Sequence, residues 1–295
     1  MGRDRTALGA FLRARRDRLT PAQAGIRAFP GSRRVPGLRR EELAVAAGLS
    51  PDYYSRLEQG RQATISVAVL DALSRALRLD EVEAAHLRDL AAPTARRGFA
   101  GGVPRQHPDP GLLRLMAALD HLPVLLLGDR GDVLARNALL PAVLGQPLRP
   151  GDSFIRYLFQ DPVARDRIDN WADFASASVA GLRRESGRHP DDRALTELID
   201  DLRATDPDVA RWWDDHTVRD YASVAKRIHH PTAGPLSFDI EIVCAPHEPD
   251  QHLVVYTAQP DSPTARVLPI LASWNTDTID NALSTRSTPD AAGGH

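Results

Sequence analysis

The side chains best suited to molecular recognition gather in one short segment of the sequence, between residues 50 and 61. They comprise hydroxyls, an acid, a phenol, an amide and guanidinium groups, namely Ser50, Asp52, Tyr53, Ser55, Arg56, Gln59 and Arg61. Such groups hydrogen-bond to the edges of DNA bases, and an arginine such as Arg56 that pairs bidentately with guanine discriminates by about 1–3 kcal/mol. Arg39 and Arg40 precede the segment and, with Arg61, suit contacts with phosphates, which position a protein without reading sequence.

Two short helices joined by a glycine turn are predicted to position these side chains. In LAVAAGLSPDYYSRLEQGR, residues 43–61, Ala44 is small where two helices would cross, and Gly48 tolerates the positive φ of a tight turn. Ser50 can cap the second helix, and Pro51 suits its first turn. In a helix-turn-helix, the N-terminal half of that second helix lies in the DNA major groove. The alternative interpretation is an ordinary helical hairpin with a solvated polar face.

Charge is distributed unevenly along the chain. Residues 1–97 contain 18 Arg against 11 acidic residues, whereas the remainder contains 19 basic against 28 acidic residues, and the net charge is −2. A basic front on an acidic body predicts a polyanionic partner for the front alone. A solvated arginine-rich surface is the simpler explanation. Charge by itself therefore does not decide between a polyanionic partner and a solvated surface.

Length and composition predict a two-domain chain without a membrane segment. A single core rarely serves 295 residues, and no apolar run approaches the roughly 20 residues that span a bilayer. The N-terminus has no apolar core and does not resemble a secretory signal. Cys244, the single cysteine, stands in an apolar alternating stretch and is expected to be a buried structural thiol in a reducing cytoplasm.

Periodicity and turn residues divide the chain into four regions. Residues 1–92 indicate a bundle of about five helices, with Asp80 capping the last one, and the Pro- and Gly-rich residues 93–111 indicate a linker. Residues 112–274 combine a strand, a turn at 129–132, a second strand, several helices including one that starts at Pro162, and two closing strands at 236–244 and 252–259. Residues 275–295 are polar and expected to be disordered. The predicted fold class is multidomain, with an all-α helix-turn-helix bundle before an α+β domain that contains an antiparallel sheet.

The N-terminal motif resembles a known family of DNA-binding domains. LRREELAVAAGLSPDYYSRLEQGR is similar to the Cro/CI-type (XRE-like) helix-turn-helix family, in which SRLEQG closes the recognition helix. The fuller pattern, with a long insertion between the first two helices, resembles the MmyB-like branch of bacterial transcription regulators. The resemblance implies that Glu58 braces the end of the recognition helix rather than contacting bases. The insertion contains Arg27, Arg33 and Arg34, which we expect to contact the DNA backbone.

The rest of the chain, to about residue 265, resembles the ligand-binding domain of MmyB-like regulators. FIRYLFQDPVARD, RWWDDHTV, HHPTAGPL and YTAQPDSP stand in the family's order. The resemblance implies a PAS-like pocket for an apolar small molecule, with a fatty acid as the known type of occupant. Arg136 departs from the pattern, since the family usually has an aromatic residue before the asparagine that is Asn137 here.

The candidate ligand-binding residues are an amide, six aromatic side chains and two imidazoles. They are Asn137, Phe154, Tyr157, Phe159, Trp171, Phe174, Trp213, His216 and His230. A cluster of aromatic side chains can line a cavity, but it is equally the composition of a hydrophobic core. Asn137 can instead pin a helix against the sheet, and the two histidines can bind a ligand carboxylate or satisfy backbone groups. Both interpretations stay open for each residue.

Nothing in the sequence predicts catalysis, a metal site or a cofactor. Serine-hydrolase, P-loop, dinucleotide and zinc-protease motifs are missing, and the histidines lack metal-ligand spacing. The predicted function is a cytoplasmic, sequence-specific DNA-binding transcription regulator that senses a small apolar ligand. The alternative is a DNA-binding regulator whose second domain only dimerises or binds a protein partner. A homodimer on double-stranded DNA is expected, because dimers bind paired half-sites about 34–36 Å apart.

Overall fold

The computed structural model describes residues 6–26, 37–62, 64–92, 106–217 and 225–284, with side chains described up to Ser273. Two compact units make up the chain: Met1–Val103 with Ser176–Asp220, here called the first unit, and Pro104–Ala175 with Tyr221–His295, the second unit. The boundary falls inside one helix, α11 (Trp171–Arg188). The domain boundaries predicted after residues 92, 111 and 274 remain predictions.

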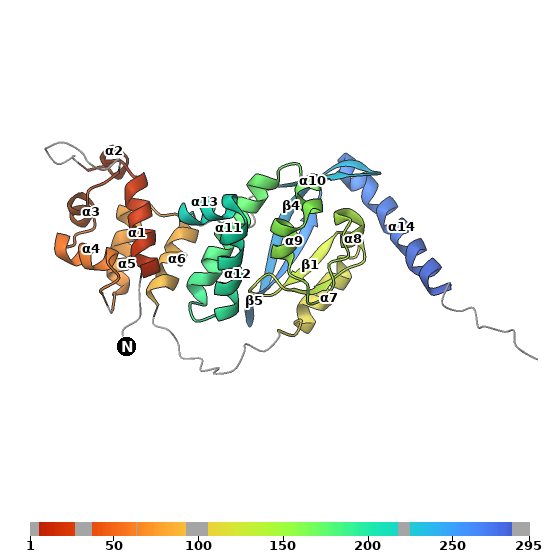
Figure 1. Cartoon of the computed structure of the whole chain (residues 1–295), viewed down its shortest axis with the longest axis horizontal. Helices are drawn as coiled ribbons and strands as arrows, with labels where there is room; N and C mark the ends of the chain where they lie inside the picture. The colour runs from red at the N-terminus through yellow and green to blue at the C-terminus, as the bar shows by residue number, and fades with distance from the viewer. Residues whose placement is uncertain (1–5, 27–36, 63, 93–105, 218–224, 285–295) are drawn as a thin grey trace, which may run out of the picture. The chain divides into compact units, whose positions relative to one another are not determined.

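The first unit is helical throughout its described residues, which confirms the predicted all-α N-terminal bundle. Its helices are α1 (Thr6–Arg18), α2 (Pro21–Ala24), α3 (Arg40–Ala46), α4 (Pro51–Glu58), α5 (Val67–Ala76), α6 (Glu81–Ala91), the later part of α11, α12 (Arg193–Thr205) and α13 (Pro207–Asp214) (Figure 1). The single turn α2 is not in the predicted set. It forms because the Thr20 hydroxyl and Gln23 make a capping box at its start.

Helix caps and apolar faces explain why the N-terminal helices form. Asp80 caps α6 as predicted, and the Ser50 hydroxyl caps α4 by accepting a hydrogen bond from the Tyr53 N–H at 3.2 Å. The apolar faces of these helices meet in one core, which includes Leu8, Phe11, Leu12, Leu38, Leu43, Ala44, Tyr54, Leu57, Leu73 and Leu87. Burial of this shared face supplies most of the stability of such short helices.

Gly9 lies where α1 meets the end of α4. A Cβ atom at this position would stand 2.1 Å from the Glu58 carbonyl oxygen, so the two backbones can approach only because Gly9 has no side chain. We expect Gly9→Ala to lower the free energy of unfolding by about 1–3 kcal/mol, because the helices must move apart. Urea unfolding measures the change. Ala7→Ser adds one heavy atom at an exposed position of the same helix and should cost about 0.5 kcal/mol or less. Equal stability of Gly9→Ala and wild type would contradict this packing.

An antiparallel sheet forms the centre of the second unit. Its strands are β1 (Val124–Leu127), β2 (Val133–Arg136), β3 (Lys226–His230), β4 (Gly234–Ala245) and β5 (Glu248–Thr257), in the order β2-β1-β5-β4-β3. The predicted strand–turn–strand and the two closing strands are confirmed, as is the PAS-like α+β fold. Strand β3 was not predicted, because its sequence lacks an apolar alternation. Its exposed positions are an arginine and a histidine, and two of its three buried positions, Lys226 and His230, are also polar.

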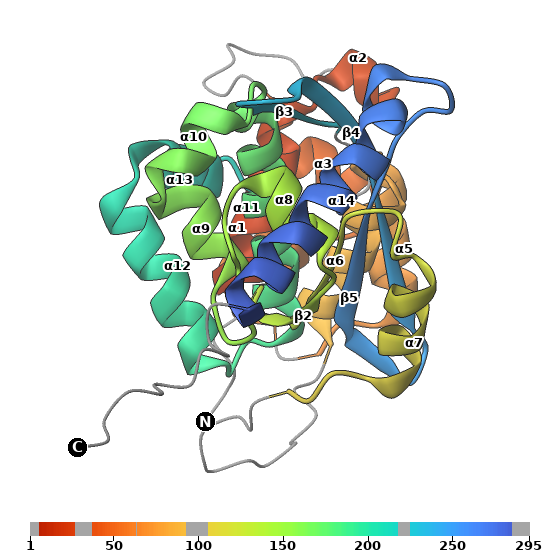
Figure 2. The ribbon, with the colours of Figure 1, turned by 90° about the vertical axis from the view of Figure 1, so that its right-hand side faces the viewer.

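Helices cover the sheet of the second unit. They are α7 (Pro110–Ala118), α8 (Leu139–Leu144), α9 (Phe154–Gln160), α10 (Pro162–Arg167), the start of α11, and α14 (Pro263–Ser284). Leu112 of α7 packs on Val124 and Leu126 of β1 and on Val255 of β5. Helix α14 packs against α8 and β4 (Figure 2). Pro162 occupies the first turn of α10 as predicted, and the chain then bends at Ile168 before α11 begins. Within the described residues, no helix is both long and apolar enough to cross a membrane.

Two helices of this unit extend past the segment limits that composition suggested. Helix α7 starts inside the predicted linker, because the Asp109 carboxylate caps it by accepting the Leu112 N–H at 2.9 Å. Helix α14 continues to Ser284, past the residue at which a disordered tail was expected to begin, since no glycine or proline follows Pro269 in it. Residues 93–105 and 285–295 lie outside the described part of the chain.

The expectation that Cys244 is a buried thiol is wrong, since its side chain is exposed. The alternation of β4 buries Leu236, Phe238 and Ile240, but Ile242 is only half-buried. The register between β4 and β5 then shifts after Val243. The C-terminal end of β4 therefore extends beyond the part of the sheet that other elements cover. The alternation of apolar residues alone does not indicate where that covered part ends.

Candidate nucleic-acid interface and ligand-binding residues

Helices α3 and α4 form the predicted helix-turn-helix. Ala44 is fully buried at their crossing, and Gly48 has a φ of 67° in the turn. The Leu49 N–H donates to the Ala44 carbonyl oxygen at 2.8 Å and closes that turn. Small size at one position and left-handed backbone at the other are the two properties that the motif requires.

The exposed face of α4 carries the residues predicted to read bases. Asp52, Arg56 and Gln59 are exposed, while Tyr53 and Ser55 are half-buried. The Arg56 guanidinium pairs with Asp52 at 3.1 Å across one helical turn, and Gln59 Nε2 donates to Ser55 Oγ at 3.1 Å. An exposed ion pair of this kind contributes little stability, so its partners can exchange it for contacts with DNA. The face is polar, accessible and held on a capped helix.

The arginines predicted to contact phosphates have different surroundings. Arg39 is half-buried at the N-cap of α3, where its N–H donates to Glu42 at 2.8 Å. Arg40 Nε donates to Glu58 at 2.7 Å, so part of its charge is already neutralised inside the protein. Arg61 is exposed just after α4. Arg27, Arg33 and Arg34 lie outside the described residues. All of these DNA contacts remain predictions.

A buried ion-pair cluster holds the end of α4 on α1. The Glu58 carboxylate, 3% exposed, accepts hydrogen bonds from Arg16 Nε at 2.6 Å and from Arg40 Nε at 2.7 Å. Arg16 also donates through Nη1 to the Leu38 carbonyl oxygen at 2.7 Å. Burial alone would raise the pKa of Glu58, but the bonds from Arg16 and Arg40 outweigh it and lower the pKa. Glu58 is therefore structural, as the family resemblance implied.

Lys226 lies at the centre of the aromatic cluster in the second unit. Its ammonium nitrogen is 5.2, 4.4 and 5.2 Å from the ring centroids of Phe154, Phe174 and Tyr256, and it donates to the Tyr256 hydroxyl at 3.2 Å. The side chain is fully buried, and burial lowers its pKa to about 7. Sequence analysis did not single out this residue. Its one signal is rarity, since Lys226 is the only lysine of the chain.

The predicted aromatic ligand residues separate into smaller groups. Tyr157 packs on Phe154 with ring centroids 5.8 Å apart, beside the Lys226 group. Phe159 and Trp171 form an edge-to-face pair at 6.1 Å, and the Trp171 indole donates to the Leu158 carbonyl oxygen at 2.9 Å. All of these rings are buried. Burial is expected both for residues of a hydrophobic core and for residues that line a pocket, so it does not distinguish the two interpretations.

The polar ligand candidates are engaged with the backbone. Asn137 Oδ1 accepts hydrogen bonds from the Val124 and Leu140 N–H groups, both at 3.2 Å, which fixes the start of α8 beside β1. His230 Nε2 is 2.9 Å from the Ala142 carbonyl oxygen, and its Nδ1 accepts the Ala233 N–H at 3.0 Å. These contacts support the structural interpretation of both residues. Trp213 and His216 belong to the first unit.

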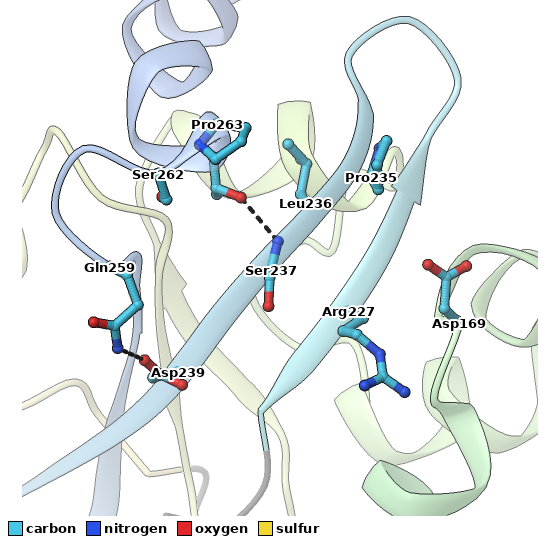
Figure 3. Close-up of a pocket in the computed structure, with 10 residues that line it drawn as sticks. Asp169, Arg227, Pro235, Leu236, Ser237, Asp239, Gln259, Ser262 and Pro263 are labelled. Carbon is cyan, nitrogen blue, oxygen red and sulfur yellow. Dashed lines mark hydrogen bonds between the residues drawn. The ribbon is translucent and has the colours of Figure 1, made fainter.

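A pocket of about 220 Å³ lies beside β3 and β4 at the start of α14 (Figure 3). Gln259 Nε2 donates to the Asp239 carboxylate at 2.5 Å on its floor, and the Ser237 N–H donates to Thr264 Oγ1 at 2.9 Å. The nine predicted ligand-binding residues do not line this particular pocket. Their role in binding a ligand remains a prediction.

Two family models match the chain. One is described as the MmyB-like transcription regulator ligand binding domain and matches residues 108–271, which is more than half of the sequence. The other is described as a helix-turn-helix domain and matches residues 7–87. No curated protein matches the chain. Both matches fall where the resemblances were predicted, and the first is to a family of transcription regulators.

Proposed function

Because the chain belongs to the MmyB-like transcription regulators, we propose that it recognises a specific DNA operator through α4 and senses a small apolar ligand with its C-terminal domain. That it is a DNA-binding regulator with a ligand-binding domain follows from the two family matches. The observation that carries the finer proposal is the exposed polar face of α4 on a capped, glycine-hinged helix pair. The proposed location is the cytoplasm, where a DNA-binding regulator would meet its operator.

Arg56 is the residue that we assign to base recognition. Its side chain is 50% exposed and forms an ion pair with Asp52. A planar guanidinium matches the two acceptors of guanine in the major groove. Arg39 and Arg61 would instead contact phosphates, whose recognition does not depend on sequence.

Arg56→Ala is expected to weaken operator binding by about 1–3 kcal/mol and to leave binding to a scrambled site almost unchanged. Arg39→Ala should weaken both sites alike and reduce the salt dependence of binding by about one unit of slope. Fluorescence anisotropy titrations on the two duplexes measure both effects. Arg193→Ala, which removes a 90% exposed arginine from α12, is the control. Equal losses on both duplexes for Arg56→Ala would exclude base recognition by this residue.

The proposed ligand is a fatty acid. Support comes from the matched ligand-binding domain and from the buried aromatic side chains of the second unit. Native mass spectrometry of the full chain purified from its own host should show the mass of the protein plus that of one organic acid per chain. Protein that carries no ligand, and whose melting temperature is unchanged by added fatty acids, would favour a C-terminal domain that only dimerises or binds a protein partner.

The proposed assembly on DNA is a homodimer. A single helix-turn-helix module buries too little surface for tight binding, and two-fold related copies reach paired half-sites about 34–36 Å apart. Sedimentation velocity with and without operator DNA tests this. A complex that contains one protein chain per duplex at saturation would exclude it.

A further inference from the structure

A second candidate site is a pocket of about 390 Å³ that lies wholly within the first unit. Helices α1, α6, α11 and α13 contribute its walls. The apolar part is formed by Leu8, Phe11, Leu90 and Trp213. A volume of this size is typical of sites for small organic molecules.

Arg183 supplies the polar end of this pocket. The residue is 8% exposed, and its guanidinium carbon lies 4.3 Å over the Trp213 ring. Nη1 is 2.9 Å from His216 Nδ1, whereas Nε and Nη2 are buried without a hydrogen-bond partner among the described residues. Stacking on Trp213 covers one face of the guanidinium, and the edge formed by Nε and Nη2 is left without a partner among the described residues. The N–H groups of Nε and Nη2 lie side by side on that edge, which is the arrangement that binds the two oxygens of a carboxylate.

No described acid is bonded to Arg183. Asp214 lies near enough to oppose part of the pKa shift, but its carboxylate already pairs with Arg203 at 3.2 Å. Burial, followed by the nearby Arg15 and Arg203, lowers the pKa of Arg183 to about 10, so the group is still charged at neutral pH. Burial also lowers the pKa of His216 to about 4, so its ring is neutral and its Nδ1 can accept the Arg183 hydrogen bond. His86 adds another buried nitrogen, Nδ1, without a partner in the described part of the chain.

Buried donors without acceptors are costly, and a buried guanidinium normally pairs with an anion. Here the pocket supplies the space for that anion and an apolar wall for the remainder of the molecule. We propose that this pocket binds a small organic monocarboxylate, whose carboxylate accepts hydrogen bonds from Nε and Nη2 of Arg183 and whose apolar part packs on Leu8, Phe11 and Leu90. A planar carboxylate suits the two-donor edge better than a phosphate, which needs donors in three dimensions. This inference does not rest on the DNA recognition proposed for α4. It concerns a different place from the fatty-acid site proposed in the second unit, and the Arg183 variants below distinguish the two.

Titration of the full chain with phenylacetate and with its neutral isostere phenylacetamide tests the site. Isothermal titration calorimetry should show one saturable site per chain for phenylacetate and much weaker binding of phenylacetamide. Arg183→Gln should weaken phenylacetate binding by roughly 30-fold or more, because the charged, bidentate contact is lost. Arg183→Lys keeps the charge without the planar edge and should give an intermediate loss. Arg193→Gln on α12 removes an exposed arginine and should bind as wild type does.

Several results would overturn the site. Phenylacetate that saturates no site on the wild type would do so, as would equal affinity for the acid and the amide. Phenylacetate binding that survives Arg183→Gln belongs elsewhere in the chain and would have the same meaning. Inorganic phosphate that binds more tightly than phenylacetate would show that the class of anion is wrong. Thermal melts establish whether each variant is folded. If Arg183→Gln does not fold, the affinity of Arg183→Lys for phenylacetate tests the site instead.

Discussion

Glu58→Leu is expected to lower the free energy of unfolding by about 3–5 kcal/mol, because it leaves the buried Arg16 charge without its main partner. The Arg16 guanidinium is 5% exposed, and its Nε is bonded to Glu58 at 2.6 Å. Arg40, whose side chain is 46% exposed, can turn to water when Glu58 is lost. Arg16 cannot, and although its Nη1 keeps Asp17 and the Leu38 carbonyl oxygen as partners, its buried Nε loses its acceptor. Urea unfolding monitored by circular dichroism measures the loss. DNA binding should fall with it, since Glu58 fixes the end of α4 on α1.

Two further variants separate the charge effect from a general loss of packing. Glu41→Leu removes an exposed acid from α3 and should change stability by about 0.5 kcal/mol or less. Glu58→Leu combined with Arg16→Met removes both charges and should recover much of the loss, because an apolar pair replaces the buried ion pair. A double variant that is no more stable than Glu58→Leu alone would show that the charge of Arg16 is not the cause.

The same cluster gives wild-type stability a dependence on acid. The pKa of Glu58 is lower in the folded protein than its ordinary value near 4.3, so the unfolded chain takes up the proton first as the pH falls. Its stabilising contribution is therefore complete above that ordinary value and is lost as the pH drops through the folded pKa. Glu58→Leu should lack this part of the acid dependence.

Lys226→Met is expected to stabilise the protein at pH 7, and the gain should shrink by about 4 kcal/mol by pH 10. The folded pKa of Lys226 is lowered to about 7 by burial, while the unfolded lysine titrates near its ordinary value of about 10.4. Between these values the unfolded chain holds a proton that the folded chain has released. Wild-type stability therefore rises with pH across this range, by about 1.4 kcal/mol per unit from this one group. Below pH 7 both states are protonated, and the penalty is complete.

The measurement is the difference in unfolding free energy between wild type and Lys226→Met, taken at several pH values. The ring faces of Phe154, Phe174 and Tyr256 favour the protonated amine and oppose part of the effect of burial. Arg227→Met, an exposed neighbour on the same strand, is the control and should show no such slope. A difference that does not change between pH 7 and pH 10 would mean that the rings keep Lys226 charged in the folded protein.

The features that could be predicted from sequence are those set by neighbouring residues. The turn at Gly48, the Ser50 and Asp80 caps and the first-turn Pro162 all depend on short-range chemistry, and all are confirmed. The buried clusters could not be predicted in this way. Arg16 and Glu58 are far apart in sequence, and the partners of Lys226 come from α9, α11 and β5.

Sequence periodicity also does not indicate at which residue a strand or helix ceases to be covered by neighbouring elements. The alternation that correctly placed β4 continues into its exposed end and so assigned Cys244 to the core. The pocket at Arg183 could not be predicted from the sequence for a related reason. Trp213 and His216 were recognised as candidates, but their position beside α1 and α6 follows from tertiary packing alone.

The division of α11 between the two units has a practical consequence for anyone who expresses this regulator in pieces. A fragment ending at residue 92 retains the helix-turn-helix but lacks residues 176–217, which contact α1 through bonds such as that from Arg15 Nη2 to the His216 carbonyl oxygen at 2.9 Å. Phe11 and His86, both buried in the whole chain, would lose the neighbours that α11 and α13 supply around the pocket. Such a truncated protein would expose an apolar patch and self-associate through it. The affinity for DNA measured with the fragment would then include the effect of self-association.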